Sequence, residues 1–247
     1  MTGKVPAMQY QFVDCRWDIA DIDRGRVLYE GGHVPGASFL DLDRDLSAPA
    51  GAAGRHPLPA ENDFAAAAGR AGIGEGVFVV AYGNTGSAER LWWLLRHFGH
   101  DEVAVLRGGI EAWGGPLVAQ SHKVEERAFV PRPRAGDTIE ADELAARLGE
   151  DGLVILDART EARFRGAPSP LDPRPGHVPG ARSLPWSADG PLPDGVLAAR
   201  EVVVYCGSGV TACVPLLRLA AAGRTDARLY PGSWSEWALR PDLPTEV

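Results

Sequence analysis

The sequence contains little cysteine. Its 247 residues include three, Cys15, Cys206 and Cys213, and no two of them have the Cys-X-X-Cys spacing. This pattern excludes a disulfide framework and a structural zinc site built on cysteine pairs. Unpaired thiols fit a reducing compartment, so we expect a cytoplasmic protein that binds no metal.

The sequence also lacks a long hydrophobic run. The apolar stretches at 77–82 and 202–206 are far too short to cross a bilayer. The first eight residues contain no apolar core of the kind that a signal peptide needs. We therefore expect a soluble protein with no membrane partner.

Positive charge is in deficit. The chain has 33 acidic against 25 basic residues and a formal net charge of −8, so its surface as a whole repels phosphate backbones. Nucleic acid is excluded as a partner on this ground. Apolar residues make up 45% of the chain, which is enough for packed cores, and the length fits one large domain or two small ones.

The main feature that is present is a long internal repeat. Four segments of the first half recur in the same order in the second half: Val13-Asp14-Cys15-Arg16 as Leu156-Asp157-Ala158-Arg159, Gly32-His33-Val34-Pro35-Gly36-Ala37 as Gly176-His177-Val178-Pro179-Gly180-Ala181, 79–83 as 202–206, and Leu106-Arg107-Gly108-Gly109 as Tyr230-Pro231-Gly232-Ser233. Four ordered matches indicate two copies of one domain. The position of Cys206 is occupied in the first copy by Gly83.

Each copy alternates short β-branched runs with helical segments. This alternation is typical of an α/β domain in which a mostly parallel sheet is flanked by helices. The polar stretch 119–137, with Pro131-Arg132-Pro133-Arg134, is typical of a linker, so we predict domains at 1–118 and 138–247. Asp137 or Thr138 is placed to cap a helix over 141–148.

The most reactive candidate is Cys206. It follows the strand-like run 202–205 and precedes a helical segment over 212–222, which places it at the carboxyl end of a strand. Gly207 and Gly209 allow the loop to curl, so that successive backbone N–H groups point toward one place. Such a nest at a helix N-terminus stabilises a thiolate, or a persulfide formed on it.

The same loop argues against another enzyme class. Cysteine phosphatases need an arginine six positions after the cysteine to hold phosphate, and Ala212 stands there. Backbone donors alone suit a sulfane sulfur better than a phosphate dianion. Cys15 in the first strand and Cys213 in the helix after the loop are predicted to be core residues.

With these residues the chain resembles the tandem-domain rhodanese family and, within it, the 3-mercaptopyruvate sulfurtransferases. The resemblance covers nearly the whole length. It depends on Cys206-Gly207-Ser208-Gly209-Val210-Thr211-Ala212, Gly232-Ser233-Trp234-Ser235-Glu236-Trp237, the two Gly-His-Val-Pro-Gly-Ala motifs and Arg90-Leu91-Trp92-Trp93. Gly-Ser after the cysteine is typical of the mercaptopyruvate branch, whereas basic residues there are typical of the thiosulfate branch.

The resemblance also implies a set of site residues. Ser208 would work with Asp43 and His56 of the first domain, and Arg163 would bind the substrate carboxylate. A second arginine of the family lies in a Pro-Glu-Pro-Arg segment, which differs here, so that Arg174 is its candidate substitute. The backbone of the loop completes the predicted substrate-binding set with Gly207, Gly209, Val210 and Thr211.

The hypothesis from the sequence is a sulfurtransferase that needs no cofactor. Sulfur would pass from 3-mercaptopyruvate to Cys206 and then to a thiol or cyanide, with thioredoxin as one candidate acceptor. Two alternatives stay open: a thiosulfate:cyanide sulfurtransferase with the same intermediate, and a carrier module that only accepts and delivers persulfide sulfur.

Overall fold

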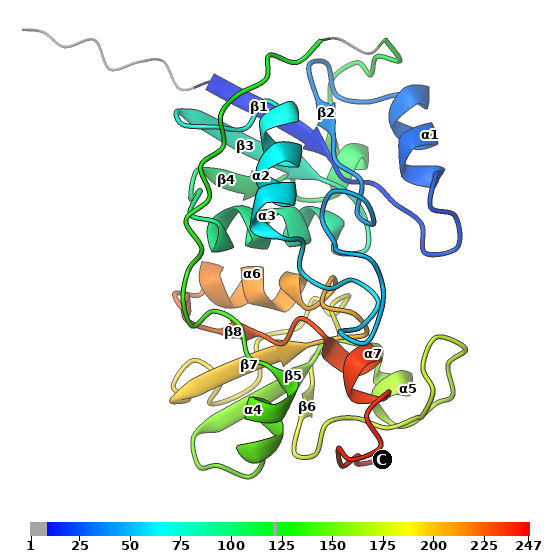
Figure 1. Ribbon diagram of the computed structural model, residues 1–247, viewed down its shortest axis with the longest axis vertical. Helices are drawn as coiled ribbons and strands as arrows, with labels where there is room; N and C mark the ends of the chain where they lie inside the picture. Colours follow the sequence, from blue (N-terminus) through cyan, green and yellow to red (C-terminus); the bar gives the residue numbers. More distant parts are fainter. Residues whose placement is uncertain (1–8, 121–122) are drawn as a thin grey trace, which may run out of the picture. The chain divides into compact units, whose positions relative to one another are not determined.

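The computed structural model describes residues 9–120 and 123–247, and the chain divides into two compact units (Figure 1). Unit 1 consists of the residues up to Leu46 and of Pro59–Pro133; unit 2 consists of Ser47–Leu58 and Arg134–Val247. Two short segments lie outside the described residues. They are residues 1–8, to which the expectation about a signal peptide applies, and residues 121–122 of the expected linker. The predicted domain boundaries at 118 and 138 stay a prediction.

Unit 1 is built on a four-stranded parallel sheet with the order β2-β1-β3-β4. Its strands are β1 (Gln9–Asp14), β2 (Ser38–Phe39), β3 (Val77–Tyr82) and β4 (Val103–Val105). Its helices are α1 (Arg24–Gly31), α2 (Glu61–Arg70), α3 (Ser87–His97) and the short 3₁₀ helix η1 (Gly109–Ala112). The strand expected over 77–82 is thus confirmed.

Unit 2 repeats this arrangement with the order β6-β5-β7-β8, again parallel throughout. Its strands are β5 (Leu153–Asp157), β6 (Arg182–Ser183), β7 (Glu201–Tyr205) and β8 (Arg228–Leu229). Its helices are α4 (Ala141–Ala146), α5 (Glu161–Phe164), α6 (Cys213–Ala221) and α7 (Ser233–Trp237). The predicted fold class, two tandem α/β domains with parallel sheets, is confirmed.

Strand β7 forms because its β-branched residues are buried on both faces of the sheet. Val203 and Tyr205 pack in one cluster with Leu144 of α4 and Trp234 of α7. Helix α6 runs along the other side of the strands (Figure 1). The carboxyl end of β7 is therefore buried within unit 2.

A buried ion pair with the same spacing ends the first strand of each unit. Arg16 Nη2 lies 2.6 Å from Asp14 Oδ2, and Arg159 Nη2 lies 2.6 Å from Asp157 Oδ2. In unit 2 the Tyr205 hydroxyl also donates to Asp157 Oδ2 at 2.6 Å. Because a buried carboxylate needs such partners, the pair fixes the turn that follows each strand.

The two repeated histidines have equivalent structural roles. His33 Nδ1 is hydrogen-bonded to the Tyr29 carbonyl at 2.7 Å, and His177 Nδ1 to the Phe164 carbonyl at 2.8 Å. Each ring also stacks on the side chain of that same residue, with the centroids 3.9 Å apart in both units. The histidines of the Gly-His-Val-Pro-Gly-Ala motifs therefore tie turns.

Helices α4 and α6 begin at residues that are set by different constraints. Helix α4 begins after Glu140, so the prediction that Asp137 or Thr138 caps it is wrong: Thr138 is instead paired with Leu229 in a β-bridge. Pro215 is the third residue of α6, within the first turn, where its missing N–H costs no helical hydrogen bond.

Over the described ranges, none of the helices is both long and apolar enough for a membrane span.

Glu201 at the start of β7 is the centre of a charge network. Arg147 donates to both of its carboxylate oxygens, at 3.0 and 2.6 Å, and Arg228 Nη1 donates to Oε1 at 2.8 Å. These hydrogen bonds, those of Arg147 first, lower the pKa of Glu201 to about 2.

Replacing this carboxylate should destabilise unit 2 in a pH-dependent way. We expect Glu201→Gln to lower the free energy of unfolding by about 1 kcal/mol at pH 7. The folded-state pKa lies below the unfolded value of about 4.3, so the stabilisation is complete above that value and is lost as the pH falls toward 2. Thermal unfolding of both proteins from pH 7 downward measures the difference, and a difference that does not shrink on acidification contradicts the assignment.

Candidate functional site

The loop that carries Cys206 connects β7 to α6. Cys206 is 1% exposed and directly follows the strand. Its Sγ accepts the backbone N–H of Gly209 at 3.1 Å, so the loop turns back over the sulfur. Val210 and Thr211 then offer their carbonyls to the N–H groups of Cys213 and Val214, at 3.1 and 3.2 Å, which begins the helix.

The turn over the sulfur requires glycine at position 209. Gly209 has a φ of +79°, a conformation that side chains disfavour. A Cβ there would also lie 2.5 Å from the Pro231 carbonyl oxygen. The N–H of Gly209 reaches the sulfur in this conformation, and any residue with a side chain would be strained there.

Helix α7 holds the loop from the other side. Cys206 donates its N–H to Ser233 Oγ at 3.1 Å, and its carbonyl accepts the N–H of Trp234 at 2.9 Å. The carbonyl of Gly207 accepts the N–H of Ser235 at 2.9 Å. The Gly-Ser-Trp-Ser segment therefore fixes the backbone of Cys206 and Gly207.

The segment Ser47–Leu58 brings a histidine to this loop. It lies between β2 and α2 in the sequence, yet it packs as part of unit 2. His56 Nδ1 and Ser208 Oγ share a hydrogen bond of 2.7 Å, and the two residues are 6% and 9% exposed. The structure thus brings together two of the predicted site residues, in a pair that can pass a proton.

Two arginines converge beside the loop on one acidic residue. Arg55 Nη1 lies 3.0 Å from Asp172 Oδ1, and Arg163 Nη2 pairs with Asp172 Oδ2. Arg55 Nη1 also donates to the Leu171 carbonyl at 2.7 Å. We call Arg55, Asp172 and Arg163 the Arg-Asp-Arg cluster. Two of its members, Arg55 and Asp172, are absent from the predicted site.

Arg174 has a role other than the predicted one. Arg174, expected as a second carboxylate ligand, instead donates Nη2 to the carbonyls of Trp237, Arg240 and Leu243, at 2.9, 2.7 and 3.0 Å. Its guanidinium therefore ties down the chain after α7. Asp43 belongs to unit 1, where its N–H donates to Asp41 Oδ1 at 2.9 Å.

The other two thiols are core groups, as predicted. Cys15 is fully buried in unit 1, and burial, with the charge of Asp14 beside it, raises its pKa well above the ordinary value. Cys213 is also fully buried and donates its Sγ to the Gly209 carbonyl at 3.5 Å. A thiol with a raised pKa, such as that of Cys15, is a poor nucleophile.

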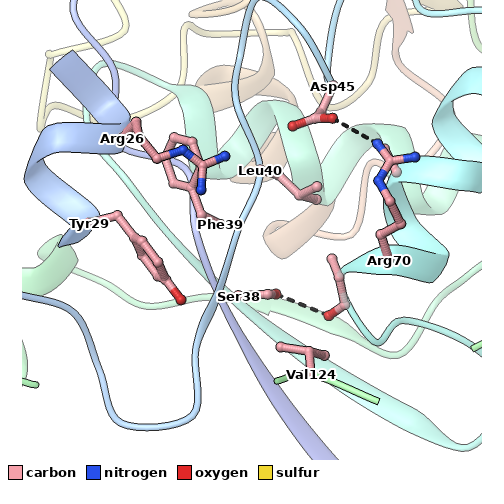
Figure 2. Close-up of a pocket in the computed structure, with 10 residues that line it drawn as sticks. Arg26, Tyr29, Ser38, Phe39, Leu40, Asp45, Arg70 and Val124 are labelled. Atoms are coloured by element: carbon pink, nitrogen blue, oxygen red, sulfur yellow. Dashed lines mark hydrogen bonds and ion pairs between the residues drawn. The ribbon is translucent and has the colours of Figure 1, made fainter. Parts of the chain in front are cut away.

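Unit 1 has no comparable sulfur site at the matching position. A Cβ on Gly83 would lie 2.4 Å from Ser87 Oγ, so a cysteine there would have to move the Ser87 side chain. Unit 1 does contain a cavity of about 380 Å³ between α1, β2 and α2 (Figure 2). There Arg26 stacks over Phe39 and Arg70 pairs with Asp45 at 3.2 Å, and no cysteine is among the lining residues.

Comparison with known proteins places this arrangement in a family. The chain matches the rhodanese-like domain over residues 4–115 and again over 140–240. It is 42% identical to a probable 3-mercaptopyruvate sulfurtransferase of Pseudomonas aeruginosa, over 94% of this chain and 90% of that protein. It is 38% identical to a putative thiosulfate sulfurtransferase of Mycobacterium tuberculosis, over 94% and 89%.

A solved structure agrees with these relatives. The 3-mercaptopyruvate sulfotransferase of Escherichia coli superposes with a TM-score of 0.76 at 32% identity, over 92% of this chain and 93% of that one. Both copies of the repeat fall within the matched regions, and the second contains the loop of Cys206. The chain belongs to the rhodanese family of sulfurtransferases.

Proposed function

We propose that this protein transfers the sulfur of 3-mercaptopyruvate to a thiol or cyanide through a persulfide on Cys206. The observation that supports the proposal is the hydrogen bond between His56 and Ser208, which lies two residues after Cys206. A donor whose leaving group is a carbanion needs such a relay, and a donor that releases sulfite does not.

The reaction begins with nucleophilic attack. The Cys206 thiolate attacks the sulfur of 3-mercaptopyruvate, and the new S–S bond forms as the C–S bond breaks. The electron pair of that bond stays on the departing carbon as an enolate. The Gly209 N–H at 3.1 Å stabilises the negative charge on the sulfur of Cys206 before and after this step.

The enolate is then protonated. Ser208 of the loop donates the proton, and His56 replaces the proton that Ser208 gives up, which releases pyruvate. Asp43 is proposed, from the family resemblance, to complete the relay. A thiol or cyanide finally attacks the outer sulfur and restores the thiolate, with thioredoxin as one candidate acceptor and the cytoplasm as the proposed compartment.

The donor carboxylate is assigned to the arginines beside the loop. Arg163 was expected in this role, and we add Arg55 in place of Arg174, because Arg174 is held by three backbone carbonyls. A guanidinium binds a carboxylate through parallel N–H groups, which orients the donor sulfur toward Cys206.

The same arginines favour a second candidate, thiosulfate:cyanide sulfur transfer. The residues after the cysteine, Gly207 and Ser208, carry no charge, but two guanidinium groups lie beside them. Positive charge stabilises departing sulfite. Thiosulfate is therefore the donor against which 3-mercaptopyruvate has to be measured.

The donor comparison is the test. We expect kcat/KM for 3-mercaptopyruvate to exceed that for thiosulfate by at least about tenfold, or about 1.4 kcal/mol in the barrier. Steady-state rates with cyanide as the common acceptor give both values. A preference for thiosulfate would reverse the donor assignment and keep the persulfide mechanism, whereas turnover with neither donor would favour a sulfur-carrier module.

A further inference from the structure

The Arg-Asp-Arg cluster contains a carboxylate of the protein where a site for an anionic donor would be expected to hold positive charge only. The Asp172 side chain is 4% exposed, and each of its oxygens pairs with a different arginine. The two arginine side chains are each 23% exposed. Two charged hydrogen-bond partners compensate for the burial of this carboxylate.

The cluster lies directly against the catalytic loop. A Cβ at Gly207 would lie 3.0 Å from Arg55 Nη2 and 3.3 Å from Arg163 Nη1. These are not the nitrogens that pair with Asp172. Each arginine therefore turns one side of its guanidinium to Asp172 and another toward the residue next to Cys206.

Unused donors remain in the cluster. The Nε atoms of Arg55 and Arg163 are both buried and have no hydrogen-bond partner within residues 9–120 and 123–247. Buried guanidinium N–H groups without a partner are costly. Both N–H groups therefore remain for a ligand to accept.

We propose that Asp172 sets the charge of the donor that this site accepts. Two guanidinium groups and one carboxylate give the cluster a net charge of +1. A donor with one negative charge matches that charge, whereas a dianion exceeds it by one, beside an Asp172 side chain that is 4% exposed. Asp172 thus favours monoanionic donors such as 3-mercaptopyruvate and disfavours dianions such as thiosulfate. This inference rests on the proposed function and deepens it.

The competing explanation is that Asp172 only positions the two arginines. In that case its replacement loosens both guanidinium groups and weakens every anionic donor alike. If Asp172 selects by charge, its replacement shifts the balance between monoanions and dianions. The ratio between two donors therefore separates the two explanations, while the rate with one donor does not.

The test uses the full-length protein with Asp172→Asn, which keeps the shape and removes the charge. We expect the ratio of kcat/KM for thiosulfate to that for 3-mercaptopyruvate to rise at least about tenfold. Asp172→Glu keeps the charge and should keep the donor order. Asp142→Asn is the matched control, because Asp142 is 79% exposed on α4 and pairs with Arg240, so the same loss of charge there should leave the ratio unchanged.

A binding measurement makes the result independent of turnover. Calorimetric titration of the Cys206→Ser protein, with and without Asp172→Asn, compares pyruvate, a monoanion, with sulfate, a dianion. The proposal requires the asparagine change to raise sulfate affinity relative to pyruvate at least about tenfold. Equal weakening of both ligands, or no change in their ratio, would overturn it. Failure of the unaltered protein to turn over either donor would count against the proposed function alone, since the titration still decides the role of Asp172.

Discussion

Replacing Cys206 with serine should abolish sulfur transfer. We expect the rate with either donor to fall at least about a thousandfold, because the covalent intermediate has no other thiol on which to form. The serine hydroxyl fits the same loop and keeps the backbone hydrogen bonds of Cys206 to Ser233 and Trp234. Cyanide-dependent turnover and the mass of the donor-treated protein are the two measurements.

The other cysteines provide the controls. Cys15→Ser and Cys213→Ser should each keep most of the activity. Cys15 has a strongly raised pKa, and the Cys213 thiol donates to the Gly209 carbonyl, whereas the Sγ of Cys206 accepts a backbone N–H. Donor treatment of the unaltered protein should add one sulfur atom, and peptide mapping should place it on Cys206. A sulfur found on Cys15 or Cys213, with Cys206 unmodified, would refute the assignment of the nucleophile.

Disrupting the pair of Ser208 and His56 should slow one donor much more than the other. We expect Ser208→Ala and His56→Gln each to lower kcat/KM for 3-mercaptopyruvate at least about a hundredfold, because the enolate then lacks its proton donor. With thiosulfate the loss should stay within about fivefold, since sulfite leaves with its electron pair and needs no proton. Single-turnover formation of the Cys206 persulfide with each donor measures the step directly.

The double variant shows whether the two residues act together. A relay is broken by the loss of either member, so Ser208→Ala with His56→Gln should be no more than about threefold slower than the slower single variant. Multiplied losses would show two independent roles. Equal losses with both donors would show that the pair only supports the loop.

The sequence predicts the fold well because the repeat supplies the same evidence twice. The strand runs at 77–82 and 202–205, the equivalent histidines and the glycine in place of the first cysteine all follow from aligning the two halves, and the parallel sheets agree with them. The start of α4 is predicted less well. A cap at Asp137 or Thr138 competes with pairing to Leu229, and this partner lies about 90 residues away, outside any local pattern.

The site is predicted only in part, because some of its contacts join residues that are far apart in the sequence. The loop of Cys206 is local, so strand, glycines and helix identify it. Arg55 directly precedes His56 in the sequence, and that adjacency is the signal that could have found it. Its partner Asp172 is 117 residues away, however. The Arg174 guanidinium donates to carbonyls at the end of α7 and in the chain that follows. Which arginine reaches the loop is settled by tertiary packing alone.

The placement of Ser47–Leu58 has a consequence for the order in which the protein is made. Those residues leave the ribosome well before the rest of unit 2, so the later part of that unit, from Arg134 onward, must capture a segment synthesised much earlier. The contact of His56 with Ser208 spans 152 residues, and contacts of such separation slow folding. His56 therefore waits for the synthesis of Ser208, and a nascent chain contains the Cys206 thiol before this contact has formed.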